Sequence, residues 1–256
     1  TTEIYTLSLH DALPICYTFV GWNIDKDANV YMYQDRSPIP ADWTDQKDGV
    51  ITLYAIWEAN KYNLTFNGNK PTNASNNVTK VPNIQENVAY DSIIRSFGTN
   101  PALDGWTFAG WYTDATNGTE VKLPYTYKTD GNVTLYAHWT ANTYTVKFSD
   151  PDHGTTVPNN TLYTYDIADT LPAMTGTVTG YTFRGWTTSI GNLTANVNTG
   201  ATVERVGGDT IYANLIKDGS AIKNLTTTNG ATITLYAVWE TNKYTLTFNE
   251  IGRAHV

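Results

Sequence analysis

Histidine and carboxylate side chains are the groups in this chain that could perform acid–base chemistry or bind a metal. The chain has 256 residues and only four His. Two acidic pairs, Asp25/Asp27 and Asp150/Asp152, have the alternating spacing of calcium loops, and His153 follows the second pair. Neither pair continues with the spaced Asp or Asn, Gly and Glu ligands of an EF-hand. We therefore expect both pairs to be solvated turns, and we predict no catalytic residue and no metal site.

Nucleophilic and cofactor chemistry have no motif in this sequence. It contains no Gly-x-Ser-x-Gly elbow and no glycine-rich phosphate loop. The single cysteine, Cys16, excludes an internal disulfide and a multi-cysteine metal site. The formal net charge of −8 argues against binding to nucleic acid. We expect no cofactor, no nucleic-acid partner and no membrane span, since no segment approaches the ~20 apolar residues that a spanning helix needs.

Three aromatic phrases recur along the chain, and this repetition carries more information than any single residue. The first phrase reads Gly-Trp-Thr-Phe-Ala-Gly-Trp at 105–111 and Gly-Tyr-Thr-Phe-Arg-Gly-Trp at 180–186, with a shorter copy at 17–22. The second phrase, Thr-Leu-Tyr-Ala-x-Trp, is followed closely by a third that begins Asn-Lys-Tyr or Asn-Thr-Tyr. The three copies of the second phrase end at Trp57, Trp139 and Trp239. The copies of the third phrase begin three residues later, at Asn60, Asn142 and Asn242. An enzyme seldom repeats its site in tandem, whereas an array of small modules does.

The repeated rings could form a platform for sugar or peptide, or they could form the core of a small domain. A domain of this size has few other large residues to bury, and each ring can bury ~150–250 Å². We therefore expect core packing. The predicted core consists of Tyr17, Phe19, Trp22, Leu53, Tyr54, Trp57, Tyr62, Leu64, Phe66, Trp106, Phe108, Trp111, Leu135, Tyr136, Trp139, Tyr144, Val146, Phe148, Tyr181, Phe183, Trp186, Leu235, Tyr236, Trp239, Tyr244, Leu246 and Phe248.

The spacing of the phrases sets the size of the module. Tyr62, Tyr144 and Tyr244 open successive copies of the third phrase, 82 and 100 residues apart. Units of this length fall in the range of small domains. We predict the end of one repeat at 16–59, a complete repeat at 60–141, an enlarged repeat at 142–241 with an insertion near 187–217, and the first strand of a further repeat at 242–249.

Local patterns predict mostly strands. Residues 62–66 alternate apolar and polar side chains, which is the period of a half-buried strand. A short helix is expected at 90–97, begun by Asp91 or Ser92 and ended by Gly98, with a weaker counterpart at 165–171. The glycines inside the first phrase, Gly21, Gly110 and Gly185, are expected at bulges or close approaches between strands.

The three phrases resemble the Listeria–Bacteroides repeat, the family that includes the B repeats of internalin-type surface proteins. The residues that carry the resemblance are 180–186, 234–239 and 243–248. The resemblance implies an α+β, strand-dominated fold of tandem β-grasp-like modules in an elongated array. It also implies a secreted or cell-wall-associated bacterial surface protein, and the family is not known for enzymes. The insertion in the third copy departs from the family pattern.

That insertion is the place where an added feature is most expected. Residues 187–210 are polar, and 211–216 form an apolar, strand-like run. The run could supply an edge strand to a partner. The plainer interpretation, which we favour, is a tolerated surface excursion, because each doubling of a loop costs only ~0.6 kcal/mol.

The two ends of the chain differ in character from the rest. Residues 1–15 and 250–256 resemble translated sequencing adapters, and we expect both to be non-native. An adapter base in codon 16 would convert a Gly codon to Cys, and the corresponding residues of the other copies are Gly105 and Gly180. Cys16 is therefore expected to replace a native Gly, and Glu250 is suspect for a similar reason.

We expect a non-catalytic stalk that holds a distal adhesive domain away from the cell. Neighbouring repeats of the same chain are its first partners, and host-surface proteins or glycans are partners of the parent protein. Two alternatives stay open. One is a glycan- or protein-binding module that acts by avidity, and the other is an accessory region of a secreted hydrolase.

Long-read sequencing across the source locus tests the interpretation of the ends. The expected result is a Gly codon at position 16 and unrelated codons in place of 1–15 and 250–256. Continuous genomic sequence that encodes Cys16 and both ends would refute it.

Overall fold

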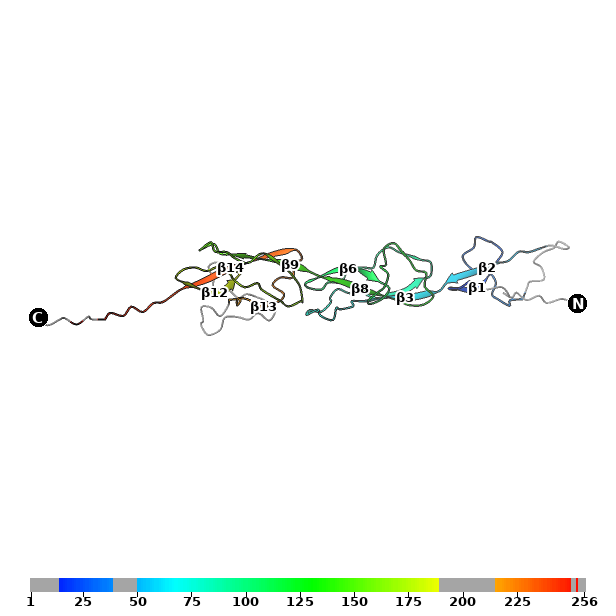
Figure 1. The fold of residues 1–256 in the computed structure, drawn as a ribbon. Helices are drawn as coiled ribbons and strands as arrows, with labels where there is room; N and C mark the ends of the chain where they lie inside the picture. Colours follow the sequence, from blue (N-terminus) through cyan, green and yellow to red (C-terminus); the bar gives the residue numbers. More distant parts are fainter. Residues whose placement is uncertain (1–13, 39–49, 189–214, 250–251, 253–256) are drawn as a thin grey trace. The chain divides into compact units, whose positions relative to one another are not determined.

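The structure, a computed structural model, describes residues 14–38, 50–188, 215–249 and 252. In these segments the chain forms fourteen short strands and no helix (Figure 1). The chain divides into two compact units. Unit 1 comprises residues 1–69, 80–101 and 110–138, and unit 2 comprises residues 70–79, 102–109 and 139–256.

Unit 1 contains a two-stranded antiparallel sheet of β1 (Tyr17–Asn23) and β2 (Tyr54–Ala59). A four-stranded sheet follows, and the division between the two units runs through its last two strands. The sheet has the order β4 (Gln85–Ala89), β3 (Lys61–Asn67), β8 (Val133–Ala141), β6 (Trp106–Tyr112). Strand β3 is parallel to β8 and antiparallel to β4. A small antiparallel pair, β5 (Ile93–Ile94) and β7 (Tyr125–Thr126), completes this part.

Unit 2 contains a second four-stranded sheet with the same pattern. Its order is β10 (Thr161–Thr164), β9 (Thr143–Ser149), β14 (Ala231–Thr241), β12 (Tyr181–Thr187). The central pair, β9 and β14, is parallel, and the outer strands are antiparallel to their neighbours. A short pair of β11 (Asp169–Thr170) and β13 (Ala221–Ile222) corresponds to β5 and β7.

The alternation read from the sequence explains how the central strands are buried. In β9, Tyr144, Val146 and Phe148 are all buried, and the residues between them lie on the other face. They join Trp186 and Leu235 in the core of unit 2. Burial of each such side chain contributes ~1.5–3 kcal/mol before the cost of ordering the chain.

The residues predicted for the core differ in their burial. Nine are buried, namely Leu64, Phe66, Trp111, Leu135, Tyr144, Val146, Phe148, Trp186 and Leu235. Thirteen are half-buried, namely Tyr17, Phe19, Trp22, Leu53, Trp57, Tyr62, Trp106, Phe108, Tyr136, Trp139, Phe183, Tyr236 and Trp239. Five are exposed, namely Tyr54, Tyr181, Tyr244, Leu246 and Phe248. The last three lie in 242–249, which forms no strand, because no described segment pairs with it as β4 and β8 pair with β3.

The predicted helices at 90–97 and 165–171 are wrong. Asp91 and Asp166 have positive φ angles of 66° and 61°, which a right-handed helix cannot contain. The Ser92 hydroxyl donates a hydrogen bond to the carbonyl of Ala89 and closes a turn. The β-branched residues that follow, Ile93 and Ile94, form β5. The strand-dominated part of the expected fold is confirmed.

Two glycines of the first phrase, Gly21 and Gly185, lie at bulges, as the sequence predicts. The strand register shifts between Phe19 and Gly21 in β1 and between Phe183 and Gly185 in β12. At Gly185 a Cβ atom would lie 2.6 Å from the carbonyl oxygen of Ile216. The backbone N–H of Trp186 donates to the carbonyl of Ile216, and the N–H of Ile216 donates to the carbonyl of Trp186. The two backbones must therefore approach closely here. The remainder of the predicted insertion, residues 189–214, lies outside the described residues.

A glycine comparison in unit 2 tests this close approach. Gly185→Ala is expected to destabilise unit 2 by ~2–4 kcal/mol, since the new methyl group must displace backbone rather than a side chain. Gly230→Ala is the matched control, because Gly230 also has a positive φ, 72°, but has open space around its Cβ position. Urea unfolding should show a larger loss for Gly185→Ala. Equal losses would mean that only backbone strain matters.

Candidate functional site: the joint between consecutive repeat phrases

The pair Tyr-Asp follows the edge strand of each four-stranded sheet, at Tyr90–Asp91 after β4 and at Tyr165–Asp166 after β10. The left-handed conformation of each Asp turns the chain away from the sheet, and Asp tolerates that conformation better than most residues. Each carboxylate thus meets the start of the preceding first phrase, at Tyr17 for Asp91 and at Trp106 for Asp166. We call the contacts around each Tyr-Asp pair a joint.

The joint in unit 2 is built on the buried carboxylate of Asp166, whose side chain has no exposed surface. The indole Nε1 of Trp106 donates a hydrogen bond to its Oδ2 at 2.9 Å. The backbone N–H of Ser75 donates to the same oxygen at 3.0 Å, and the Ser75 hydroxyl donates to Oδ1. The amide of Asn224 donates to Oδ1 at 2.8 Å, and the Lys223 ammonium lies 3.5 Å from it. Three segments distant in sequence therefore meet at one charge.

These donors decide the ionisation of Asp166. Burial by itself would raise the pKa of this carboxyl group. The hydrogen bonds from Ser75, Asn224 and Trp106 outweigh burial and lower the pKa to about 2. The group is therefore a stable anion at neutral pH, and it acts as an acceptor for its neighbours rather than as an acid or base.

Asn142 is the second element of the joint, and all four of its polar groups are used. Its N–H donates to the carbonyl of Gly105 at 2.9 Å, and its carbonyl accepts from the N–H of Tyr165 at 2.8 Å. Its side-chain oxygen accepts from the Thr107 hydroxyl at 2.6 Å. Its amide donates to the carbonyl of Thr227 at 2.8 Å. Asn142 thus links the first phrase to the Tyr-Asp pair through one residue.

The ring of Tyr165 lies directly on Gly105. A Cβ atom at Gly105 would overlap the Tyr165 ring, and the φ angle of Gly105 is +79°. Glycine is therefore required both for its backbone conformation and for the space that it leaves. The Tyr165 hydroxyl accepts a hydrogen bond from the side-chain amide of Asn76 at 3.2 Å.

Unit 1 contains the corresponding joint around Asp91. The Tyr17 hydroxyl donates to Asp91 Oδ2 at 3.1 Å, and Lys128 forms an ion pair with the same carboxylate. The hydrogen bonds from Lys128 and Tyr17 lower the pKa of Asp91. Asn60 repeats the pattern of Asn142, because its carbonyl accepts from the N–H of Tyr90 at 2.8 Å. Its side-chain oxygen accepts from the Thr18 hydroxyl at 2.6 Å.

The two joints differ in how well the carboxylate is covered. The Asp91 side chain is 38% exposed, whereas that of Asp166 is fully buried. Residues 70–79 supply Ser75 to Asp166, and no described segment covers Asp91 in this way. Cys16 takes the place of Gly105 in unit 1, with a φ angle of 71° where Gly105 has 79° and Gly180 has 82°. Its carbonyl accepts from the N–H of Asn60 at 2.9 Å, so the backbone arrangement is the same.

The joint residues are those that the sequence did not single out for this role. Tyr90, Asp91 and Tyr165 were expected in helices, and Asn60 and Asn142 only as the first residues of the third phrase. A usable signal exists, because Tyr-Asp follows the Asn-x-Tyr phrase once in each of the repeats predicted at 60–141 and 142–241. The signal is short, and the spacing from Asn to Tyr-Asp differs between the two copies.

The acidic turns considered as metal sites form local hydrogen bonds. Asp25 Oδ1 accepts from the N–H of Asp27 at 3.0 Å. Asp150 is buried, and its Oδ2 accepts from the Thr155 hydroxyl at 2.8 Å. Burial opposes ionisation of Asp150, but the hydrogen bonds from Thr155 and His153 lower its pKa. Across the described segments, no group of three or more His, Cys, Asp or Glu side chains is placed to hold a metal ion.

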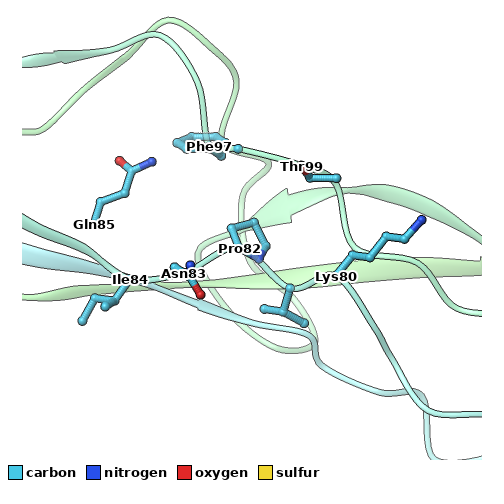
Figure 2. A pocket seen from close by; sticks show the side chains of 9 residues that line it. Lys80, Pro82, Asn83, Ile84, Gln85, Phe97 and Thr99 are labelled. Atoms are coloured by element: carbon cyan, nitrogen blue, oxygen red, sulfur yellow. The ribbon is translucent and has the colours of Figure 1, made fainter.

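The described surface has two open hollows, one in each unit. The first, in unit 1, has a volume of about 640 Å³ and lies between 80–85 and 97–99 (Figure 2). Lys80 is the one charged side chain among its lining residues, with Phe97 and Pro82 as apolar walls. The second, in unit 2, has a volume of about 600 Å³ and is lined by His153 with Thr and Gly residues.

The pH dependence of unit 2 tests the role of Asp166. Its folded pKa lies below the unfolded value of ~3.9, so its contribution to stability is complete above about pH 5 and is lost as the pH falls towards about 2. Asp166→Asn should cost roughly 2 kcal/mol at pH 7 and should flatten this acid loss. Hydrogen exchange of residues 161–171 under urea measures both effects. Asp152→Asn, at an exposed turn position, is the control, and an unchanged acid loss in Asp166→Asn would contradict the assignment.

Comparison of the sequence with known proteins identifies the family of this chain. The family model of the Listeria-Bacteroides repeat domain matches residues 62–138 and 144–214, more than half of the chain. No solved structure matches significantly. No helix among the described residues is long and apolar enough to span a membrane.

Three curated relatives are similar over part of their length. A protein of Evansella cellulosilytica whose name describes a Gly-rich membrane protein is 28% identical over 302 aligned positions, covering 100% of this chain and 32% of the relative. A second membrane-protein relative from this organism is 28% identical over 80% of this chain and 25% of its own length. Internalin H of Listeria monocytogenes is 33% identical over 49% of this chain and 20% of its own length. The chain thus spans a third or less of each relative, and its repeated phrases and matched residues make it a member of the Listeria-Bacteroides repeat family.

Proposed function

We propose that the chain is a non-catalytic repeat region of a bacterial cell-surface or secreted protein. In this proposal the region is a stalk that presents a distal adhesive domain. The observation that carries the proposal is the joint, which occurs in both units with the same Asn, Tyr and Asp roles. A stalk needs connections that hold their angle, and a repeated, hydrogen-bonded connection supplies that property.

The joint resists bending for two physical reasons. Opening the contacts of Asp166 would leave a buried charge without its donors, and loss of a hydrogen bond to a charged group costs ~1.5–3 kcal/mol. The connection itself has no slack, because Asn142 is the single residue between the end of β8 and the start of β9. Asn60 occupies the same place between β2 and β3.

The module that the joint connects is proposed to be β-grasp-like. The central parallel pair β9 and β14, flanked by antiparallel β10 and β12, supports this description. In the described part of the crossover between these parallel strands, residues 150–188 and 215–230, the chain forms short strands and turns and no helix. Tandem modules with the boundaries predicted from the sequence, 60–141 and 142–241, would then form an elongated array.

The surface location rests on the relatives and the family. Internalin H and the two Evansella proteins named as membrane proteins are similar to this chain over part of their length. We propose that this chain likewise belongs to an extracellular or wall-associated protein, with neighbouring repeats as its immediate partners.

A binding role acting by avidity is the second candidate, and one surface favours it. Val30, Tyr31 and Met32 are consecutive and exposed in unit 1, although the neighbouring Tyr33 pairs with Trp22. An exposed apolar turn of this kind could contact a host protein or a glycan.

Solution scattering of the full chain tests the stalk proposal. The expected profile is that of an elongated particle with a narrow distribution of end-to-end lengths. Asp166→Ala should broaden that distribution because it removes the acceptor of the unit 2 joint, whereas Asp152→Ala should leave it unchanged. A compact profile for the unmodified chain would refute the stalk.

A further inference from the structure

A joint has two halves: the start of the first phrase with the Asn residue that bonds to it, and the Tyr-Asp pair that packs against them. Strands β12 and β14, at the end of unit 2, repeat the first of these halves. Gly180, Tyr181 and Thr182 correspond to Gly105, Trp106 and Thr107, and Asn242 corresponds to Asn142. The contacts within this half are already made. The N–H of Asn242 donates to the carbonyl of Gly180 at 2.8 Å, and the Thr182 hydroxyl donates to the side-chain oxygen of Asn242 at 2.6 Å. The equivalent distances at Asn142 are 2.9 and 2.6 Å.

The second half of this joint is unfilled in the part of the chain that the structure describes. Space around the Cβ position of Gly180 is open, whereas the Tyr165 ring occupies that space at Gly105. The Tyr181 ring is 36% exposed, whereas Trp106 is half-buried and donates to Asp166. Among the described residues, no backbone N–H donates to the carbonyl of Asn242 as that of Tyr165 does to Asn142.

The Tyr181 side chain is held in place from one side. Its ring packs edge-on against His153 at a centroid distance of 4.7 Å. His153 also packs edge-on against Trp239, at 5.8 Å. On the same two strands, Arg184 lies 3.4 Å from Glu240 in an ion pair. The surface is therefore ordered before any occupant arrives, which reduces the cost of binding.

We propose that Gly180, Tyr181, Thr182 and Asn242 form a docking surface for the Tyr-Asp turn of one further repeat of this family. The occupant's Tyr ring covers Gly180, its Tyr N–H donates to the carbonyl of Asn242, and its Asp carboxylate accepts from the Tyr181 hydroxyl. The joint of unit 1 shows that a tyrosine can serve as this donor, because the Tyr17 hydroxyl bonds Asp91. The inference rests on the proposed function, since it assumes that joints connect repeats.

The chain itself supplies the probe for the test. Residues 242–249 match 60–67 in seven of eight positions, so a copy of residues 68–141 in place of 250–256 continues the sequence as a repeat. The measurement is nitration of Tyr181 by tetranitromethane, located by mass spectrometry. Nitration is expected in the unextended chain and is expected to be lost in the extended chain. Tyr54, 38% exposed and outside this surface, is the internal control and should react equally in both.

Two variants of the copy separate docking from general protection. Asp91→Ala in the copy removes the proposed acceptor and should restore nitration of Tyr181. Glu86→Ala in the copy removes an exposed carboxylate of β4 and should not. Equal nitration of Tyr181 in the extended and unextended chains would overturn the inference, as would a copy that stays unfolded beside this surface. Neither result changes the scattering of the unextended chain, so failure here is distinguishable from failure of the stalk.

Discussion

The requirement to satisfy one buried carboxylate organises unit 2. Asp166 lies where water does not reach, and a charge in that position is tolerated only with several donors. Those donors come from residues 70–79, from the start of β6 and from the turn after β13. None of the three segments is near Asp166 in sequence. The carboxylate is therefore the point at which the order of these segments in space is specified, although an apolar contact in its place could be equally stable.

Uncharged groups of Asn142 also connect the first phrase to the Tyr-Asp pair of unit 2. Asn142 carries a hydrogen bond on each of its four polar groups, and its two backbone bonds run in opposite directions along the chain. A residue that is tied on both sides cannot serve as a hinge. Gly105 adds shape to this chemistry, because the absence of a side chain there lets the Tyr165 ring lie on the backbone. Hydrogen bonding, conformation and packing thus agree at one place, which is typical of a contact that specifies a single arrangement.

The two joints differ in strength because they differ in solvent exposure. Around Asp91 the ion pair with Lys128 is open to water, and exposed pairs of this kind contribute little to stability because solvent screens them. Around Asp166 the accepting carboxylate is itself fully buried, and each hydrogen bond to the charge counts for more. The loop at 70–79 contributes to this difference, because Ser75 donates two hydrogen bonds to Asp166. A family of repeats can in this way vary the strength of its connections by changing a loop while keeping the strands.

The sequence alone predicted the central strands, the aromatic residues that fill part of the core and the bulges at Gly21 and Gly185, although the strand expected at 242–249 does not form. Period-two alternation in 144–148 depends on neighbours two positions apart, and a glycine between aromatic residues in a strand is typical of a bulge or a close backbone approach. The tertiary structure decided the rest. Residues 90–97 have the composition of a short helix, but the left-handed Asp91 and the pairing of Ile93 and Ile94 with β7 override that preference.

The joint was decided at the same level, since Ser75 and Trp106 reach Asp166 across 91 and 60 residues of chain. No local pattern encodes which carboxylate such donors will meet. Strand period and glycine geometry are local properties, whereas the partner of a buried charge is settled only when the sheets have formed.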